Sequence, residues 1–368
     1  MLGGKNDFKK VDMSSIGQYI KLKYPVLYNF LVEFINKAIL ATRPYSIYIT
    51  DNLGGSFKNY FVSNNMPLKI NELTKNLDAE SIELIQIIIQ RLLFYPDGKY
   101  KGRTSKNDSV VGGLLPVETR VQQKLIDQQI HIVTKSVNLP RQMIEESVFY
   151  FYHGLSLLPK EVHEYIKEQH FMDLGAYVGD SAIALSKYQY SKIFSLEISL
   201  KSIEQYNLNM KANKISDEKY EIFNIGVASS DNEPPVTMYD TGSTGLSLYR
   251  KAGRYDEIQI ERKSLDWIVE QNTIEPKFIK VDIEGAAMDF VNGAIKTLPK
   301  FRPVLSIAIY HNPIEFFEVK PALEALLSNY TFLIRKLASG VKNNLIHSEV
   351  VLLAYPKELM AAKCVKWL

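Results

Sequence analysis

The 368-residue sequence predicts an α/β protein in which a parallel sheet, covered by helices on both faces, follows a mainly helical region. Three observations lead to this prediction. Short apolar runs alternate with helical patterns from about residue 160, and a glycine turn follows the first of these runs. Before residue 160 the sequence shows helical patterns without that alternation. Strands alternating with helices are typical of parallel sheets, because each parallel connection must cross back over the sheet.

The amino-acid composition is that of a soluble globular protein, with 46% hydrophobic and 23% charged residues. The 44 basic and 41 acidic side chains nearly balance and form no dense basic stripe, so no nucleic-acid partner is expected. Cys364 is the only cysteine, which excludes an internal disulfide and a thiolate metal cluster.

The sequence gives no sign of export or membrane insertion. Residues 1–10 are polar and lack the apolar core of a secretory signal. No uninterrupted apolar run reaches the ~18–20 residues that a transmembrane helix requires. We therefore expect a cytoplasmic protein without a transmembrane segment, while attachment to a membrane through a partner stays open.

The region 1–150 is predicted to be mainly helical and to contribute either substrate contacts or a homodimer interface. A stretch rich in glycine, lysine, serine, asparagine and aspartate, residues 97–113, is predicted to be a loop or boundary. The expected helices and turn are a helix at 24–40, a helix from Asp78 or Ser81 to Phe94, a turn at 96–98 and an amphipathic helix at 118–137.

The region 151–368 is predicted to form the sheet domain. The expected strands are residues 171–174, 192–196, 220–225, 278–281 and 304–309, and the expected helices are 181–187, 201–212, 265–271 and 286–298. A helix at 321–328 and two closing strands, 330–336 and 350–355, are expected to complete the sheet.

The turn DLGAYVGDS, residues 173–181, connects the first predicted strand to a helix. Ligands of doubly wound sheets bind at the carboxyl ends of the strands, and Gly175 and Gly179 would let the chain pass close to an adenosine with an amino-acid tail. We expect Asp173 to accept a hydrogen bond from the ligand's ammonium group, directly or through water. The remaining candidate contacts in this turn are Ala176, Tyr177, Asp180 and Ser181. An ordinary strand-to-helix turn is the alternative interpretation.

Two other nucleotide-binding motifs are excluded by spacing. A dinucleotide fold uses GxGxxG, but Tyr177 occupies the second glycine position, where a side chain would crowd a pyrophosphate. The phosphate-binding motif GxxxxGK followed by serine or threonine is absent from the sequence. A nicotinamide-dependent oxidoreductase is therefore disfavoured.

Glu197 follows Asp173 by 24 residues and ends the next predicted strand. An acidic residue about 20 residues beyond a Rossmann turn accepts the ribose hydroxyls, so Glu197 is expected to bind a ribose. Its alternative role is to cap the helix that begins near Ser199. Asn224 and Gly226, at the end of the third strand, are expected to lie near an adenine.

Given these residues, the sequence resembles the FkbM family of methyltransferases over about residues 150–356. The resemblance is densest in DLGAYVGDS at 173–181, in FIKVDIEGA at 278–286 and in IAIYH at 307–311. Gly293-Ala294 and Arg302-Pro303 follow at the family's spacing, and FYHGL at 151–155 resembles the segment that precedes the domain in longer members. Ala287 departs from the pattern, because the family usually has a glutamate there.

The resemblance implies a Rossmann-like class I methyltransferase sheet that uses S-adenosylmethionine. It further implies O-methylation, often of a sugar hydroxyl in a glycan or glycosylated metabolite, so that the partner is a small-molecule or glycan acceptor. A second interpretation is a protein that binds S-adenosylmethionine without transferring a methyl group, for which Ala287 is the motivating departure.

The candidate catalytic residues are Asp282, Lys280, Glu284 and His311. Asp282 ends the fourth strand, where it is also expected to lie near the cofactor, and Lys280 points to the same face. Asp282 and His311 are the two candidate general bases. Each of three residues has an alternative role. Lys280 could be a charge partner of Asp282, Glu284 could cap a helix, and His311 could be a loop histidine beside the turn signal Asn312-Pro313. A divalent cation is possible at this cluster, but no metal site is predicted.

Overall fold

The computed structural model describes residues 45–50, 54–94, 99–104, 115–240, 246–247, 257–338 and 348–361. The chain forms two compact units, of which the larger comprises residues 48–101 and 110–368. Strands β1 (Tyr45–Thr50) and β2 (Lys99–Thr104) pair in a two-stranded sheet. The predicted loop at 97–113 is therefore wrong over 99–104, where the pairing between β1 and β2 overrides a polar, turn-like composition.

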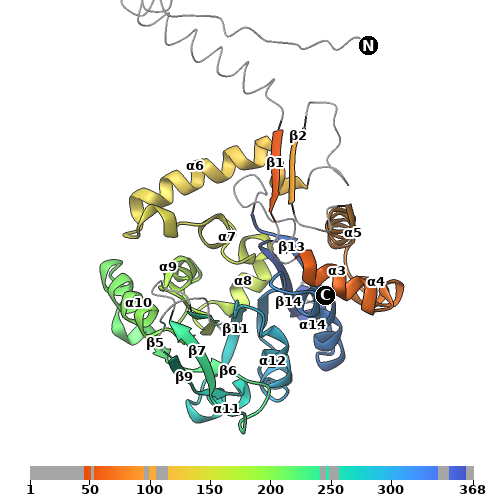
Figure 1. Cartoon of the computed structure of the whole chain (residues 1–368). Helices are drawn as coiled ribbons and strands as arrows, with labels where there is room; N and C mark the ends of the chain where they lie inside the picture. Colours follow the sequence, from red (N-terminus) through yellow and green to blue (C-terminus); the bar gives the residue numbers. More distant parts are fainter. Residues whose placement is uncertain are drawn as a thin grey trace, which may run out of the picture. The chain divides into compact units, whose positions relative to one another are not determined.

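A seven-stranded sheet in the order β13-β14-β12-β11-β3-β4-β5 organises the larger unit (Figure 1). Strands β3 to β5, β11 and β12 run parallel, and β14 runs antiparallel to both of its neighbours. This arrangement confirms the predicted Rossmann-like class I methyltransferase sheet. The strands are β3 (His170–Leu174), β4 (Lys192–Leu196), β5 (Tyr220–Phe223), β11 (Pro276–Val281), β12 (Val304–Ala308), β13 (Tyr330–Lys336) and β14 (Val350–Pro356).

Helices cover both faces of this sheet, since every residue of β12 and β14 is buried although alternate side chains point to opposite faces. In Figure 1, α9 and α10 lie together, as do α12 and α14. The helices of the sheet domain are α7 (Glu146–Phe149), α8 (Lys160–Ile166), α9 (Asp180–Leu185), α10 (Leu200–Ala212), α11 (Leu265–Gln271), α12 (Ala287–Asn292), α13 (Thr297–Phe301), α14 (Pro313–Leu326) and α15 (Glu358–Ala361).

Five short strands between β5 and α11 were not predicted. Strand β6 (Gly226–Val227) pairs in parallel with β10 (Arg262–Lys263). A separate antiparallel sheet contains β7 (Val236–Asp240), β8 (Leu246–Ser247) and β9 (Glu257–Ile260). Strand β5 accordingly ends at Phe223, two residues earlier than expected.

Two predicted helices have different bounds in the structure. The helix expected at 286–298 is divided into α12 and α13 at Gly293, whose Cβ would lie only 2.2 Å from the carbonyl oxygen of Ala228. The helix expected at 321–328 begins instead at Pro313, because Asn312 caps it by accepting a hydrogen bond from Glu315 N (2.9 Å). Asn312-Pro313 is thus a helix start rather than a turn, with proline at its favoured first position.

The helices before the sheet domain pack against it within the larger unit. Helix α5 packs on the edge strand β13, and Ser81 Oγ accepts a hydrogen bond from Ile334 N (2.8 Å). Phe57 is buried and its ring meets that of Phe316 edge-on, with centroids 6.0 Å apart. These helices are α3 (Gly54–Ser63), α4 (Met66–Thr74), α5 (Ala79–Phe94) and α6 (Arg120–Ser136).

Over the described part of this region the mainly helical character is confirmed, and α5 covers an edge strand that would otherwise expose unpaired backbone groups. The amphipathic helix predicted at 118–137 corresponds to α6, preceded by a 3₁₀ turn at Pro116–Glu118. The helix at 24–40 and the turn at 96–98 lie outside the described residues, and the boundary at residue 150 stays a prediction.

Replacing Phe57 with alanine tests whether these helices share the core of the sheet domain. We expect Phe57→Ala to lower the free energy of unfolding by about 3–5 kcal/mol, because it leaves a cavity between α3 and α14. Urea denaturation measures the change. Val62→Ala, at an 82% exposed position of the same helix, is the matched control and should change stability by less than about 0.5 kcal/mol. Equal effects of the two variants would contradict a shared core.

Candidate active site

The turn between β3 and α9 has a left-handed backbone at both of its glycines. The φ angles of Gly175 and Gly179 are +81° and +85°, and Tyr177 also has a positive φ of +46°. The backbone N–H groups of Gly175 and Ala176 both donate to Leu196 O at 3.0 Å, which joins the turn to β4. A Cβ at Gly175 would lie 1.8 Å from Asp282 O, so the turn also lies directly against the end of β11. Only glycine fits this position.

Glu197 lies beside this turn, as the sequence predicted. Its Oε2 accepts a hydrogen bond from Tyr177 N and its Oε1 accepts one from Ser199 N, each at 2.8 Å. Burial raises the pKa of the Glu197 carboxyl, and these backbone donors offset the increase only in part. Each oxygen of a carboxylate has two lone pairs, so Glu197 retains acceptor capacity for the hydroxyls of a ribose.

Asn224 is brought next to Glu197, and Gly226 follows at the start of β6. The exposed side chain of Asn224 donates to the carbonyl oxygens of Glu197 and Ile198, both at 3.0 Å. Gly226 N donates to Glu261 O at 2.9 Å. The ends of β4 and β5 are thereby held together at the carboxyl edge of the sheet, where an adenine was expected.

Asp173 and Lys280 form a buried ion pair between neighbouring strands. Lys280 is opposite Asp173 in the register of β11 and β3, and its Nζ lies 3.0 Å from Asp173 Oδ1. The same Nζ donates to Gly175 O at 2.7 Å. Burial lowers the pKa of Lys280, but the charges of Asp173 and Asp282 outweigh it and leave the pKa above its ordinary value. Lys280 is therefore a charged clamp on the glycine turn.

This pair bears on two sequence-based expectations. Asp173 has no exposed surface and its carboxylate faces Lys280; its hydrogen bond with a ligand ammonium group, directly or through water, stays a prediction. Lys280 was expected either to act with Asp282 in catalysis or to serve as its charge partner. The structure shows Lys280 as a charge partner, but of Asp173. Burial of Asp173 raises the pKa of its carboxyl, and the charge of Lys280 counters only part of that rise.

Asp180 and Ser181 begin α9 and are both buried. Burial raises the pKa of Asp180 to about 6, although the charge of Lys280 acts in the opposite direction. A carboxylate at a helix N-terminus is favoured by the helix dipole. The two residues thus directly follow the glycine turn, as predicted, and both are buried.

His311 joins three carboxylates at the end of β12. Its Nε2 lies 3.2 Å from Asp282 Oδ1 and 3.7 Å from Glu284 Oε2, and its Nδ1 lies 3.2 Å from Glu315 Oε2. Burial lowers the pKa of His311, but the hydrogen bonds and charges of Asp282 and Glu315 raise it to about 10. The imidazole is therefore protonated near neutral pH.

Asp282 and Glu284 differ in their exposure. The Asp282 side chain is 31% exposed; burial favours its neutral form, but the His311 hydrogen bond and the charge of Lys280 leave the pKa of Asp282 below its ordinary value. Glu284 is 90% exposed on a left-handed backbone, with a φ of +52°. The structure thus brings Asp282, Glu284 and His311 together.

Glu315 supplies a carboxylate where the sequence departs from the family pattern. Its Oε1 accepts a hydrogen bond from Ala287 N (2.9 Å), at the N-terminus of α12. Both Ala287 and Glu315 are buried, each with a relative exposure of 1%. A carboxylate therefore reaches this helix start from α14.

A small cavity, which we call the β11 cavity, lies beside Asp282 at the carboxyl edge of the sheet. Its polar lining includes His153, Tyr310 and Glu349, of which Tyr310 and Glu349 were not among the candidate site residues. The sequence did contain a signal for His153, because it lies in the segment 151–155 that resembles the family. It contained no such signal for Glu349. The full lining is His153, Lys280, Val281, Asp282, Ser306, Ala308, Tyr310, Leu337, Glu349 and Val351.

Metal and membrane features were searched over the described residues. No group of three or more histidine, cysteine, aspartate or glutamate side chains among them is arranged to hold a metal ion. Within the same residues, no helix is both long and apolar enough to cross a membrane.

Comparison with known families matches residues 173–334 to the methyltransferase FkbM domain, which confirms the predicted resemblance. The methyltransferase FkbM from Methylobacillus flagellatus is 16% identical with a TM-score of 0.49; the match covers 82% of this chain and 61% of that protein. This chain thus spans less than two thirds of that relative.

Two smaller proteins also match. An O-methyltransferase from Bacillus cereus in complex with S-adenosylhomocysteine is 12% identical (TM-score 0.35), with 63% of this chain and 100% of that one covered. The O-methyltransferase TomG from Streptomyces achromogenes, in complex with S-adenosylmethionine, is 11% identical (TM-score 0.35), with 65% and 99% covered. No curated protein matches the sequence.

Substitution of Gly175 tests the close approach between the turn and β11. Gly175→Ala should lower the free energy of unfolding by more than about 2 kcal/mol and abolish binding of S-adenosylhomocysteine, because of the positive φ and the clash with Asp282 O. Thermal unfolding and titration calorimetry measure the two effects. In Gly226→Ala the new methyl group would meet the Arg262 side chain at 3.1 Å and Ile260 Cγ2 at 3.5 Å, and no backbone atom, so this control should fold normally. Normal stability of Gly175→Ala would show that the turn lies elsewhere.

The charged state of His311 predicts a pH-dependent contribution to stability. With a pKa of about 10 in the folded protein against 6.5 ordinarily, His311 stabilises the fold fully below pH 6.5 and loses this contribution as the pH rises through 10. The stability difference between the wild type and His311→Gln should therefore be largest near the lower pH and shrink towards the higher one, by urea denaturation. His131→Gln, at an exposed position of α6, controls for the exchange itself. A difference that does not vary with pH would argue against the imidazolium.

Proposed function

We propose that this methyltransferase, whose residues 173–334 match the FkbM domain, transfers a methyl group from S-adenosylmethionine to a sugar hydroxyl of a glycan or glycosylated metabolite. One observation carries the proposal. The glycine turn and Glu197 meet at 2.8 Å through Tyr177 N, at the carboxyl ends of β3 and β4, and the same turn lies against Asp282. Ligands of doubly wound sheets bind at this point.

The residues present fit the methyl donor. Glu197 would accept the ribose hydroxyls, the left-handed turn at Gly175 and Gly179 would lie along the adenosine and its tail, and Asn224 and Gly226 would border the adenine. When bound, S-adenosylmethionine supplies a methyl group activated on a sulfonium. Because Asp173 is paired with Lys280, its role in this proposal is to fix the turn in addition to its predicted hydrogen bond with the ligand.

The acceptor would approach from the side of β11 and β12. Asp282 is partly exposed and can accept a hydrogen bond from a hydroxyl, which holds the nucleophile in near-attack geometry. His311 is protonated at neutral pH and so cannot accept a proton; in this proposal it fixes the Asp282 carboxylate. Glu284, exposed in the loop, would contact the acceptor from the rim.

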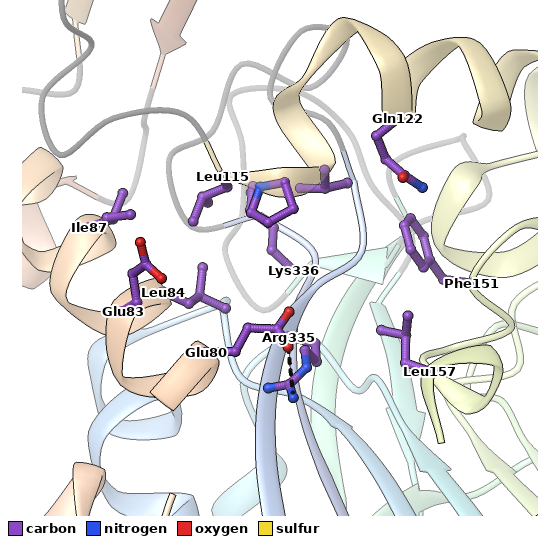
Figure 2. A pocket seen from close by; sticks show the side chains of 12 residues that line it. Glu80, Glu83, Leu84, Ile87, Leu115, Gln122, Phe151, Leu157, Arg335 and Lys336 are labelled. Atoms are coloured by element: carbon purple, nitrogen blue, oxygen red, sulfur yellow. Dashed lines mark ion pairs between the residues drawn. The ribbon is translucent and has the colours of Figure 1, made fainter. Parts of the chain in front are cut away.

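A groove beside the β11 cavity supports the proposal that the region 1–150 contributes acceptor contacts. Figure 2 shows Leu84 and Ile87 of α5 with Phe151 among its apolar lining and Glu83 and Gln122 among its polar lining. The groove has a volume of about 190 Å³. An apolar and aromatic wall with a few carboxylate and amide groups suits a sugar ring and its hydroxyls.

The groove and the β11 cavity are lined by neighbouring residues of the same segments. Phe151 and Lys336 line the groove, and His153 and Leu337 line the cavity. In this proposal, an acceptor bound in the groove presents a hydroxyl to Asp282. A homodimer interface is the other role proposed for the region 1–150.

The second candidate function is binding of S-adenosylmethionine without transfer, which Ala287 motivates. The contact of Glu315 with Ala287 N weakens that alternative, because a carboxylate is still present at this helix start. Calorimetry with S-adenosylmethionine, followed by transfer of a tritiated methyl group to a panel of methyl glycosides, separates the two. Binding with no turnover on any glycoside would favour the second function.

Asp282→Asn tests the acceptor side of the site. We expect kcat for tritium transfer to fall by about 10²-fold or more, because the amide neither accepts the hydroxyl's hydrogen bond as strongly nor holds His311. The affinity for S-adenosylhomocysteine, measured by calorimetry, should stay within a few-fold of the wild type. Asp127→Asn, an exposed position of α6, is the matched control. Unchanged turnover in Asp282→Asn would remove this residue from the mechanism.

A further inference from the structure

The β11 cavity contains polar groups that the contact between Asp282 and His311 does not explain. His153, Tyr310 and Glu349 reach it from three separate segments, which follow α7, follow β12 and precede β14. Buried polar groups are normally hydrogen-bonded, so an incompletely paired set around a cavity indicates a ligand or a proton-transfer site.

Glu349 is positioned at the same sheet edge as Asp282. In the antiparallel register of β14 and β12, Val351 is opposite Ala308, which places Glu349 just beyond the carboxyl end of β12. Tyr310 Oη donates to Glu349 Oε1 at 3.3 Å, and Leu337 N donates to Glu349 O at 2.8 Å. Glu349 has a φ of +55°, an uncommon conformation for this residue type that often occurs at functional sites.

His153 is the second unexplained group in the cavity. Its side chain is buried, with a relative exposure of 8%, and its Nε2 has no hydrogen-bond partner among the described residues. The backbone fixes it, because Ser306 Oγ donates to His153 O at 2.6 Å and the residue has a φ of +52°. Burial and the charge of Lys280 lower the pKa of His153 to about 3, so the ring is neutral. A neutral imidazole nitrogen can pair with a hydroxyl, which both donates and accepts.

We propose that the acceptor hydroxyl enters the β11 cavity, where Glu349 accepts its proton and His153 Nε2 forms a hydrogen bond with it. The proposal rests on the proposed function and names the proton acceptor of that site. The hydroxyl's only proton is donated to Glu349, which removes it, so Asp282 orients the acceptor by accepting a hydrogen bond from a neighbouring hydroxyl of the sugar. As the O–H bond breaks, the proton goes to a Glu349 oxygen and the oxygen's electron pair forms the bond to the methyl carbon, whose bond to sulfur breaks with its pair left on sulfur.

The charges around Glu349 favour it over the other candidates as the proton acceptor. Burial, then the negative charges of Asp282 and Glu145, raise the pKa of Glu349 to about 7, while Ser147 and Lys336 act in the opposite direction. Bases are most effective when their pKa lies near the working pH. Asp282 has a lowered pKa, and His311 is already protonated. The titratable and charged groups that face Glu349 are Asp282, Glu145, Lys336, Tyr310 and His153.

The first arm of the test measures the proton on Glu349 without turnover. Carbon-13 NMR of the full chain, labelled at glutamate carboxyls and saturated with S-adenosylhomocysteine, should show one carboxyl that titrates near pH 7. That resonance should be lost in Glu349→Gln and retained in Glu204→Gln, an exposed carboxylate of α10 that serves as the control. A Glu349 carboxyl that titrates below pH 5 would overturn the proposal.

The second arm measures transfer of a tritiated methyl group to the panel of methyl glycosides. In the wild type, kcat/KM should fall as the pH drops through about 7, because the carboxylate form is required. Glu349→Gln should lose this limb and about 10²–10³-fold in kcat, with KM and S-adenosylhomocysteine affinity within a few-fold. Retention of the acidic limb in Glu349→Gln would also overturn the proposal.

The two arms separate failure of the proton acceptor from failure of the proposed function. If the wild type transfers no methyl group to any glycoside, the proposed sugar acceptor fails, and the NMR arm still decides whether Glu349 carries the proton. Glu349→Asp keeps the carboxylate but shortens the side chain, so partial recovery of kcat and of the acidic limb is expected. Thermal unfolding of each variant confirms that the fold is intact.

Discussion

The buried ion pair between Asp173 and Lys280 is the interaction on which the site depends. It joins β3 to β11 at the point where the chain order of the sheet changes direction, and Lys280 also binds Gly175 O. Removing one partner of a buried pair leaves an uncompensated charge and typically costs about 3–5 kcal/mol. The glycine turn, the end of β11 and therefore Asp282 are held in one geometry by a single ammonium group. Its charge also adds to the effect of burial, which lowers the pKa of His153.

The distribution of charge along the carboxyl edge separates the roles of the carboxylates. Lys280 pairs with Asp173, and His311 pairs with Asp282 and Glu315, so each of these carboxylates has a basic group beside it. Glu349 instead faces Asp282 and a tyrosine hydroxyl. Neighbouring carboxylates in a buried site cannot all stay charged without counter-ions, and the least compensated one takes up a proton most readily. The proton affinity of Glu349 is thus raised because Lys280 and His311 pair with the other carboxylates.

Sequence reasoning found the features that are local in the chain. The turn with Gly175 and the carboxylate of Glu197 follow from a motif and from the length of one crossover. The pairing of Lys280 with Asp173 could not be predicted in this way, because it depends on the register of two strands separated by about a hundred residues. Asn312-Pro313 has the composition of a turn and of a helix start alike, and only packing distinguishes them. Glu349 carries no local signal, since antiparallel pairing of β14 with β12 places it.

The two closing strands, β13 and β14, explain how one edge of the sheet can have a methyl-donor side and a separate acceptor side. A parallel sheet presents only the carboxyl ends of its strands at this edge, and here β3 to β5 supply the groups assigned to the methyl donor. Because β14 runs antiparallel to both β12 and β13, it brings its own start and the end of β13 to the same edge. Glu349 and Lys336 therefore reach the acceptor side from a part of the chain that is distant from the turn motif in sequence. Helix α5 packs on the edge strand β13 and so protects the edge of the sheet. Residues of the same helix line the groove together with Lys336, so the helix that protects the edge also forms part of the proposed acceptor side.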